Sequence, residues 1–123
     1  MAPPTEKRKT PRIQPYVAPC VLVDGSRRVA AYLTDLSVRG ARVSTEDDPP
    51  AVHARVVIEM RLGRAISPSR LPGQVKWVRR HGKGHDFGLT FVGVTSELQR
   101  TLEAVVAEFR RLADALGPTP AGR

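Results

Sequence analysis

The sequence predicts a mainly β fold: a six-stranded antiparallel β-barrel with one C-terminal α-helix packed on it. Six short segments of strand-like composition follow one another with short connections, and no helical pattern separates them. Near the C-terminus the apolar residues recur at three- and four-residue steps, which is the period of an amphipathic helix. We expect the sheet to close into a barrel, because closure removes exposed strand edges. A chain of 123 residues is long enough for one such domain with a modest core.

The first three strands are predicted from β-branched residues and turn signals. Residues 16–23 have the β-branched content of a strand, and Asp24-Gly25 marks a hairpin turn. Residues 27–36 then return as the second strand. Residues 41–44 form the third strand after a bend at Gly40, where a residue without a Cβ permits the turn.

The last three strands are predicted after a polar connection. Residues 53–62 hold several apolar side chains without a helical stripe and form the fourth strand. Residues 63–72 are predicted to be a loop, because prolines and Pro72-Gly73 would break a strand. Residues 74–80 and 86–92 are the fifth and sixth strands, joined by a glycine-rich turn.

The final element is a predicted helix that follows the sixth strand. Its apolar stripe consists of Leu98, Leu102, Val105, Val106, Phe109, Leu112 and Leu116. Ser96 with Gln99 three residues later matches a capping box, and Gly117-Pro118 ends the pattern. Burying this stripe would contribute on the order of 10 kcal/mol before conformational entropy is subtracted. We expect the helix to cover or plug the barrel, and docking of a partner protein is the alternative.

These elements divide the chain into three parts. Residues 1–14 are predicted to be a flexible basic arm, residues 15–116 the barrel with its helix, and residues 117–123 a disordered tail. The formal net charge of +8 favours an anionic partner: a nucleotide, a nucleic acid, an acidic protein surface or a membrane face. The first twelve residues hold four Lys or Arg against one Glu, so the excess charge begins in the arm.

The most distinctive stretch, residues 34–40, reads Thr-Asp-Leu-Ser-Val-Arg-Gly. If it is extended, Asp35, Ser37 and Arg39 lie on one face and the intervening Leu and Val point to the core. The polar face is then free to meet a ligand. Gly40 would allow close approach by another molecule, or would simply form a tight bulge.

A second motif lies in the arm, where Arg8 and Arg12 have the spacing Arg-x-x-x-Arg. Pro11 disfavours a helix at this point, so the arm is expected to be extended, with the two side chains roughly 13 Å apart. Each guanidinium can bond a phosphate or a guanine edge through two N–H groups. Lys7 is a secondary candidate that would add attraction. Taken alone, such a run is also typical of a solvated basic tail.

The two motifs, in this order and separated by one strand-like segment, resemble the PilZ domain family. The resemblance implies a split barrel that is a receptor for the bacterial second messenger cyclic di-GMP. It implies that Arg8 and Arg12 hold guanine and phosphate, and that Asp35, Ser37 and Gly40 line the base-binding surface. All five positions match.

The resemblance covers nearly the whole chain, because Gly73-Gln-Val-Lys-Trp-Val and Phe87-Gly-Leu-Thr-Phe also look like closing strands of the family. It implies a standalone receptor that acts by altered protein–protein interaction with an output partner, in motility, adhesion or exopolysaccharide control. Binding would order the arm and change the surface that the partner meets. The chain has no membrane-length apolar run and no secretion signal, so we expect a cytoplasmic protein without membrane insertion.

Two further residues have two interpretations each. Arg39 contacts the ligand or remains a solvated arginine. Trp77 stacks on a base, or packs in the core if it alternates with Lys76 and Val78 on an ordinary strand. The strand pattern favours the core for Trp77.

Catalysis and metal binding are disfavoured. The histidines His53, His81 and His85 lack the spacing of a metal site, and no histidine is placed to act as a base for Ser37. Cys20 sits in a strand-like segment and is expected to be a buried thiol. We therefore predict no catalytic residue, no metal and no cofactor beyond the ligand itself.

Two alternatives to a nucleotide receptor remain open. One is a small basic barrel that binds RNA or single-stranded DNA through surface cations: Arg27, Arg28, Arg79, Arg80 and Lys83. Only 5% of the residues are aromatic, which leaves few stacking platforms and disfavours nucleic acid. The other is a PilZ-like docking scaffold that does not bind nucleotide, against which the complete five-residue signature argues.

Overall fold

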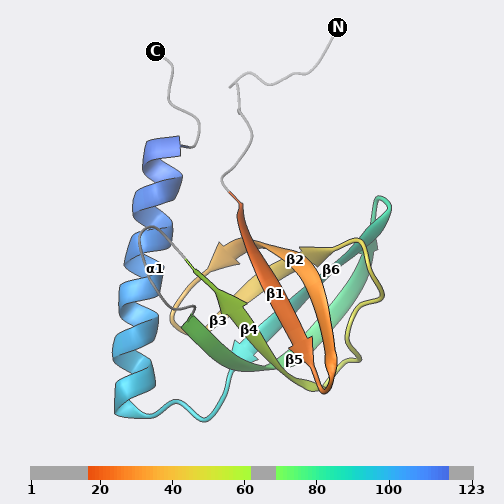
Figure 1. Ribbon diagram of the computed structural model, residues 1–123, viewed down its shortest axis with the longest axis horizontal. Helices are drawn as coiled ribbons and strands as arrows, with labels where there is room; N and C mark the ends of the chain where they lie inside the picture. Colours follow the sequence, from red (N-terminus) through yellow and green to blue (C-terminus); the bar gives the residue numbers. More distant parts are fainter. Residues whose placement is uncertain (1–16, 62–68, 117–123) are drawn as a thin grey trace, which may run out of the picture.

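The computed structural model describes residues 17–61 and 69–116. In this part of the chain it has six strands and one helix, in the predicted order (Figure 1). The elements are β1 (Ala18–Asp24), β2 (Arg27–Leu36), β3 (Gly40–Thr45), β4 (Arg55–Met60), β5 (Ser69–His81), β6 (Gly84–Phe91) and α1 (Ser96–Leu116). The predicted fold class is confirmed.

The strands form a closed barrel in the order β1-β2-β3-β6-β5-β4, and every neighbouring pair is antiparallel. Four of these pairs are consecutive in the chain, as hairpin-length connections predict. The other two pairs, β3 with β6 and β1 with β4, close the barrel. The β1–β4 ladder has only three partner pairs, from Val21↔Glu59 to Val23↔Val57, and is the shortest in the sheet.

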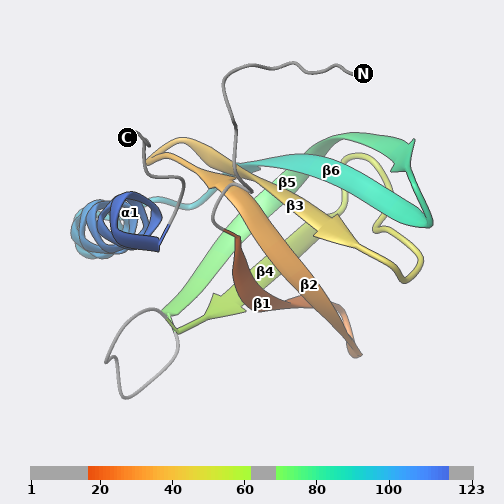
Figure 2. The same ribbon diagram turned by 90° about the horizontal axis from the view of Figure 1, so that it is seen from above.

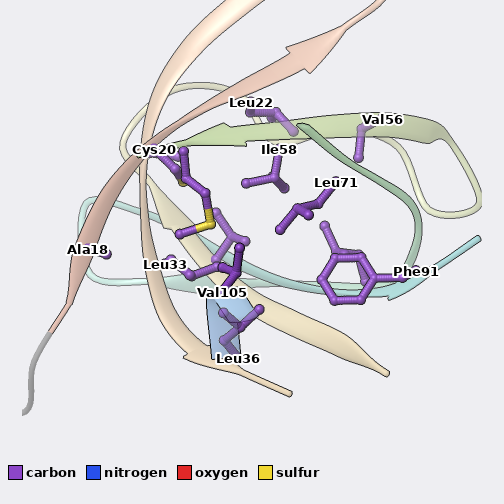
Figure 3. Packing of buried hydrophobic residues seen from close by; sticks show 14 of the residues in the cluster. Ala18, Cys20, Leu22, Leu33, Leu36, Val56, Ile58, Leu71, Phe91 and Val105 are labelled. Carbon is purple, nitrogen blue, oxygen red and sulfur yellow. The ribbon is translucent and has the colours of Figure 1, made fainter. Parts of the chain in front are cut away.

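The core fills the interior of the barrel and the surface beneath α1. Val29, Ala31 and Leu33 of β2 are buried in alternation, as expected for a strand with one face toward a core. Leu36 is buried beyond a register shift between Leu33 and Asp35, and Figure 3 shows Leu33 and Leu36 among the core side chains. Figures 1 and 2 show α1 lying along one side of the barrel. Its residues Leu102, Val105 and Val106 are at most 8% exposed, and Figure 3 shows Val105 among the core side chains. The helix therefore covers the barrel, and its buried apolar face is part of the same core.

The N-cap of the helix lies one residue earlier than predicted. Thr95 Oγ1 accepts the N–H of Leu98 at 3.1 Å, and the Thr95 carbonyl accepts the N–H of Gln99 at 2.8 Å. Thr95 is therefore the N-cap, and the prediction of Ser96 was wrong. Adjacent residues with equivalent hydroxyl groups make this position ambiguous in the sequence.

The predicted loop at 63–72 was partly wrong, because β5 begins at Ser69 and includes Pro72. Pro72 is paired with Val57 of β4, and its carbonyl accepts the N–H of Val92 at 3.1 Å. The N and O of a strand residue point to the same side, so the missing N–H of Pro72 faces β6. Because β6 ends at Phe91, beside this proline, the sheet loses no ladder hydrogen bond there.

β4 begins at Arg55, two residues later than predicted. His53, which was assigned to this strand, adopts a φ of 76°, a left-handed conformation that a strand does not use. Its N–H donates to the Val75 carbonyl at 2.8 Å, so the loop before β4 is fixed against β5.

Candidate functional site

The stretch 34–40 forms the end of β2 and a turn, not one continuous strand. Asp35 is exposed near the end of β2, and the next residue, Leu36, is buried. Beyond it, Ser37 N–H donates to the Gly40 carbonyl at 2.9 Å, which closes a tight turn. Val38 is 38% exposed, so its predicted place in the core was wrong. The alternation of inward and outward side chains stops at the turn, so it cannot be used to place the residues that follow Leu36.

The Ser37 side chain holds this turn together. Its Oγ accepts the backbone N–H of Arg39 at 3.2 Å and that of Gly40 at 3.3 Å. A serine hydroxyl that accepts nearby backbone N–H groups is a common turn device. The Ser37 O–H also donates to the Gly40 carbonyl at 3.4 Å, so the hydroxyl is engaged within the turn both as an acceptor and as a donor.

Gly40 lies where β3 comes against β6. It is paired with Thr90, and a Cβ at this position would collide with the backbone carbonyl of Leu89. Backbone cannot move aside as a flexible side chain can. The glycine is therefore required by the approach of the two strands, whatever the ligand.

A single row of paired residues crosses four strands on the outer face of the barrel. Asp35 of β2 is paired with Arg42 of β3, and Arg42 with Gly88 of β6. Gly88 is paired in turn with Trp77 of β5. The register of the barrel thus brings the carboxylate and the indole, which are far apart in the sequence, onto one surface.

An open pocket of about 330 Å³ lies over this row. Its lining includes all the predicted site residues within the described part of the chain: Asp35, Ser37, Arg39, Gly40 and Trp77. The predicted candidates Lys7, Arg8 and Arg12 lie outside the described residues.

Trp77 lies on the outer surface beside the pocket, so its predicted place in the core was wrong. The register shifts between Val75 and Trp77, where Val75 is fully buried and Trp77 is 39% exposed. This β-bulge inserts Lys76 without a partner and reverses the alternation that the sequence pattern assumed. The indole lies over Gly88, where a Cβ would collide with it.

Two cations of the pocket were missed from the sequence. Arg42 and Lys76 both line it and are exposed. Arg42 could have been found, because it precedes the buried Val43 in a predicted strand and must point outward. Lys76 could also have been found, because it follows the apolar Val75 in a predicted strand and alternation places it outward.

The charges of the pocket suit an anion. Three cations, Arg39, Arg42 and Lys76, line it together with one carboxylate, Asp35. An excess of positive charge in a concave surface attracts and retains anions. The arrangement also offers a flat aromatic ring and a carboxylate acceptor, the two groups that a purine base requires for stacking and for recognition of its N–H donors.

Other chemistry has little support in residues 17–61 and 69–116. No three His, Cys, Asp or Glu side chains there gather closely enough to hold a metal ion. Cys20 is buried, as predicted, and burial raises the pKa of its thiol to about 12. Such a thiol is protonated at neutral pH and is a poor nucleophile. In the same part of the chain, no helix has the length and apolar character needed to cross a membrane.

Solved structures share this architecture. The PilZ domain of YcgR from Escherichia coli, described with c-di-GMP, is 20% identical, with 89% of this chain and 96% of that chain covered and a TM-score of 0.67. The PilZ domain of CeSA from a cellulose-synthesizing bacterium is 22% identical over 79% of this chain and 96% of that chain, with a TM-score of 0.61. The Bacillus subtilis inhibitor of motility MotI/DgrA is 14% identical over 87% of this chain and 53% of that chain, with a TM-score of 0.57.

These likenesses show the fold, and a comparison of sequences shows the family. A search of curated proteins found no match. The sequence model of the PilZ domain matches residues 6–108, which include both predicted motifs, the whole barrel and more than half of α1. The chain belongs to the PilZ domain family.

Proposed function

We propose that this protein is a receptor for cyclic di-GMP and binds it in the pocket over the row from Asp35 to Trp77. The observation that carries the proposal is the meeting of a carboxylate, an indole and three cations in one open pocket of a PilZ domain. A similar fold, the PilZ domain of YcgR, has been described with c-di-GMP, which supports the choice of ligand. The role proposed is binding and adaptor function, not catalysis.

Each group in the pocket has a part in recognition. Asp35, as an ionised acceptor, suits the N–H donors on the Watson–Crick edge of guanine, which adenine does not present in the same pattern. The Trp77 ring offers a stacking surface worth about 1–3 kcal/mol per base. Arg42 and Lys76 can pair with the phosphates that join the two nucleotides.

Ser37 and Gly40 act mainly through the backbone. Ser37 fixes the turn that follows Asp35 by accepting two backbone N–H groups. Gly40 lets β3 approach β6, so that Arg42 and Gly88 pair at the centre of the row. Both residues thereby hold the groups that contact the ligand in register.

The basic arm completes the site in this proposal. Arg8 and Arg12 supply two guanidinium groups for guanine and phosphate, and Lys7 adds attraction. The match to the family model begins at residue 6 and so includes all three. Binding of the ligand orders the arm over the pocket and changes the surface that an output protein meets. The pathway is motility, adhesion or exopolysaccharide control, in keeping with two of the similar structures, the inhibitor of motility and CeSA from a cellulose-synthesizing bacterium.

Backbone amide chemical shifts test the location of the site. Cyclic di-GMP is added to the isotope-labelled protein, and we expect the largest changes around Asp35, Arg42, Trp77 and Gly88. The outer face of β1 and β4, on another side of the barrel, is the internal control. Changes concentrated on that face, or no change anywhere, would contradict the proposal.

A further inference from the structure

A second row of polar residues lies next to Trp77, on the side toward the β5–β6 turn. Ser44 of β3 is paired with Asp86 of β6, and Asp86 with Arg79 of β5. This row runs beside the one from Asp35 to Trp77 and is displaced by two residues along each of these three strands. None of its three residues lines the pocket. The row therefore lies beside the pocket, where its residues can contact a residue that lines it.

Arg79 contacts the Trp77 ring directly. Its guanidinium carbon lies 5.5 Å from the centroid of the indole, within the range of a cation–π interaction. The same indole lies over Gly88, where any Cβ would collide with it. The indole is thus in contact with both the backbone of β6 and a cation, while the residue still lines the pocket.

Asp86 holds Arg79 in this place. The residue is only 7% exposed, and a buried carboxylate requires partners for its oxygens. Oδ1 accepts the hydroxyl of Ser44 at 2.9 Å. Oδ2 lies 3.6 Å from Nη2 of Arg79 and 3.9 Å from Nδ1 of His81. The Arg79 side chain is itself 59% exposed, so its position over the ring depends on this anchor.

We propose that Arg79 is a positioning residue for the ligand pocket and that Asp86 and Ser44 are its anchor. The three form a relay that fixes the indole of Trp77 against Gly88, so that the part of this residue that remains exposed, 39%, is available to a guanine base. The inference rests on the proposed function and goes beyond it, since none of these three residues lines the pocket. A ring that is free before binding must lose that freedom on binding, which weakens affinity. Because the relay orders the ring before the ligand binds, less conformational freedom is lost on binding.

The competing interpretation is that Arg79 is one of several interchangeable surface cations. Arg80 provides the matched control, because it carries the same charge on the next residue and points to the opposite face of the strand. If only charge matters, substitutions at the two positions should have equal effects. If the relay matters, only Arg79 should change the environment of the indole.

Tryptophan fluorescence makes the test direct, because Trp77 is the only tryptophan of the chain. The variants Arg79→Gln, Arg79→Lys, Asp86→Asn and Arg80→Gln are compared with the unmodified protein for acrylamide quenching without ligand and for affinity toward cyclic di-GMP. We expect Arg79→Gln and Asp86→Asn to raise quenching and to weaken binding roughly two- to fivefold, the loss of one exposed cation–π contact. Arg79→Lys should restore part of both, and Arg80→Gln should leave quenching unchanged.

Two outcomes would contradict the proposed role of Arg79. In the first, Arg79→Gln leaves both quenching and affinity unchanged. In the second, Arg80→Gln weakens binding as much as Arg79→Gln does. The Arg79 variants decide the question even if Asp86→Asn fails to fold, because the Arg79 side chain is exposed. If the unmodified protein does not bind cyclic di-GMP, the proposed function fails, while the quenching comparison still tests the relay by itself.

Discussion

Asp35 and Trp77 stand at the two ends of one row of paired residues that crosses β2, β3, β6 and β5. Between them lie Arg42, which brings a cation, and Gly88, which makes room for the indole. The pocket is therefore positioned by the register of a closed barrel, with only one side formed by the β2–β3 turn. A site built on paired strands is held more rigidly than one built on loops.

The first prediction concerns base specificity. Asp35→Ala should weaken binding of cyclic di-GMP by about 1.5–3 kcal/mol, or roughly 10- to 150-fold, because a charged acceptor of guanine N–H groups is lost. It should also reduce the preference over cyclic di-AMP, measured by competition. An unchanged preference would remove Asp35 from base recognition.

The second prediction concerns the arm. Arg8→Ala or Arg12→Ala should each cost about 2–4 kcal/mol of binding, a loss of roughly 30- to 1000-fold, if each arginine makes one or two charge-assisted bonds. Lys83→Ala is the control for generic charge, since Lys83 is exposed in the β5–β6 turn. Equal losses for the arm and the control, measured by calorimetry at one salt concentration, would contradict a specific clamp.

The third prediction is that alanine substitutions at two glycines have different effects. In Gly40→Ala the added methyl meets the backbone of β6, so unfolding in urea should show a loss of about 1–3 kcal/mol in stability. In Gly88→Ala it meets the Trp77 side chain, which can move, so the main effects should be altered tryptophan emission and weaker binding. The reverse pattern would mean that the two close approaches are assigned incorrectly.

The fourth prediction concerns Cys20. Burial raises the pKa of its thiol to about 12, so it should resist alkylation at pH 8 until the protein unfolds. The folded state retains this proton above the pKa of the unfolded thiol, so stability should fall as pH rises from about 8.5 toward 12. Cys20→Ala, compared over the same range, should show a shallower fall. Rapid alkylation of the folded protein would contradict the buried environment.

The sequence was sufficient for the order of the elements and for the part of the pocket formed by residues 35–40. Hairpin signals, β-branched segments and one helical stripe predict six strands and α1, because local patterns specify these elements. Asp35, Ser37 and Gly40 were found from a compact motif. Arg42 was within reach through strand alternation but was not selected.

The missed features depend on tertiary structure. Trp77 was assigned to the core because a β-bulge cannot be predicted from alternation. Val38 was wrongly placed because the turn held by Ser37 interrupts the strand. Pro72 was read as a breaker because the sequence does not show that β6 ends beside it.

Titration calorimetry of the full chain with cyclic di-GMP at moderate salt tests the central claim most directly, with GTP and a single-stranded oligonucleotide as controls. We expect saturable binding of the cyclic dinucleotide, with a stoichiometry near one or two, and no comparable heat from either control. Binding of the oligonucleotide that falls steeply with salt, together with no heat from cyclic di-GMP, would contradict the account and favour a nucleic-acid-binding barrel.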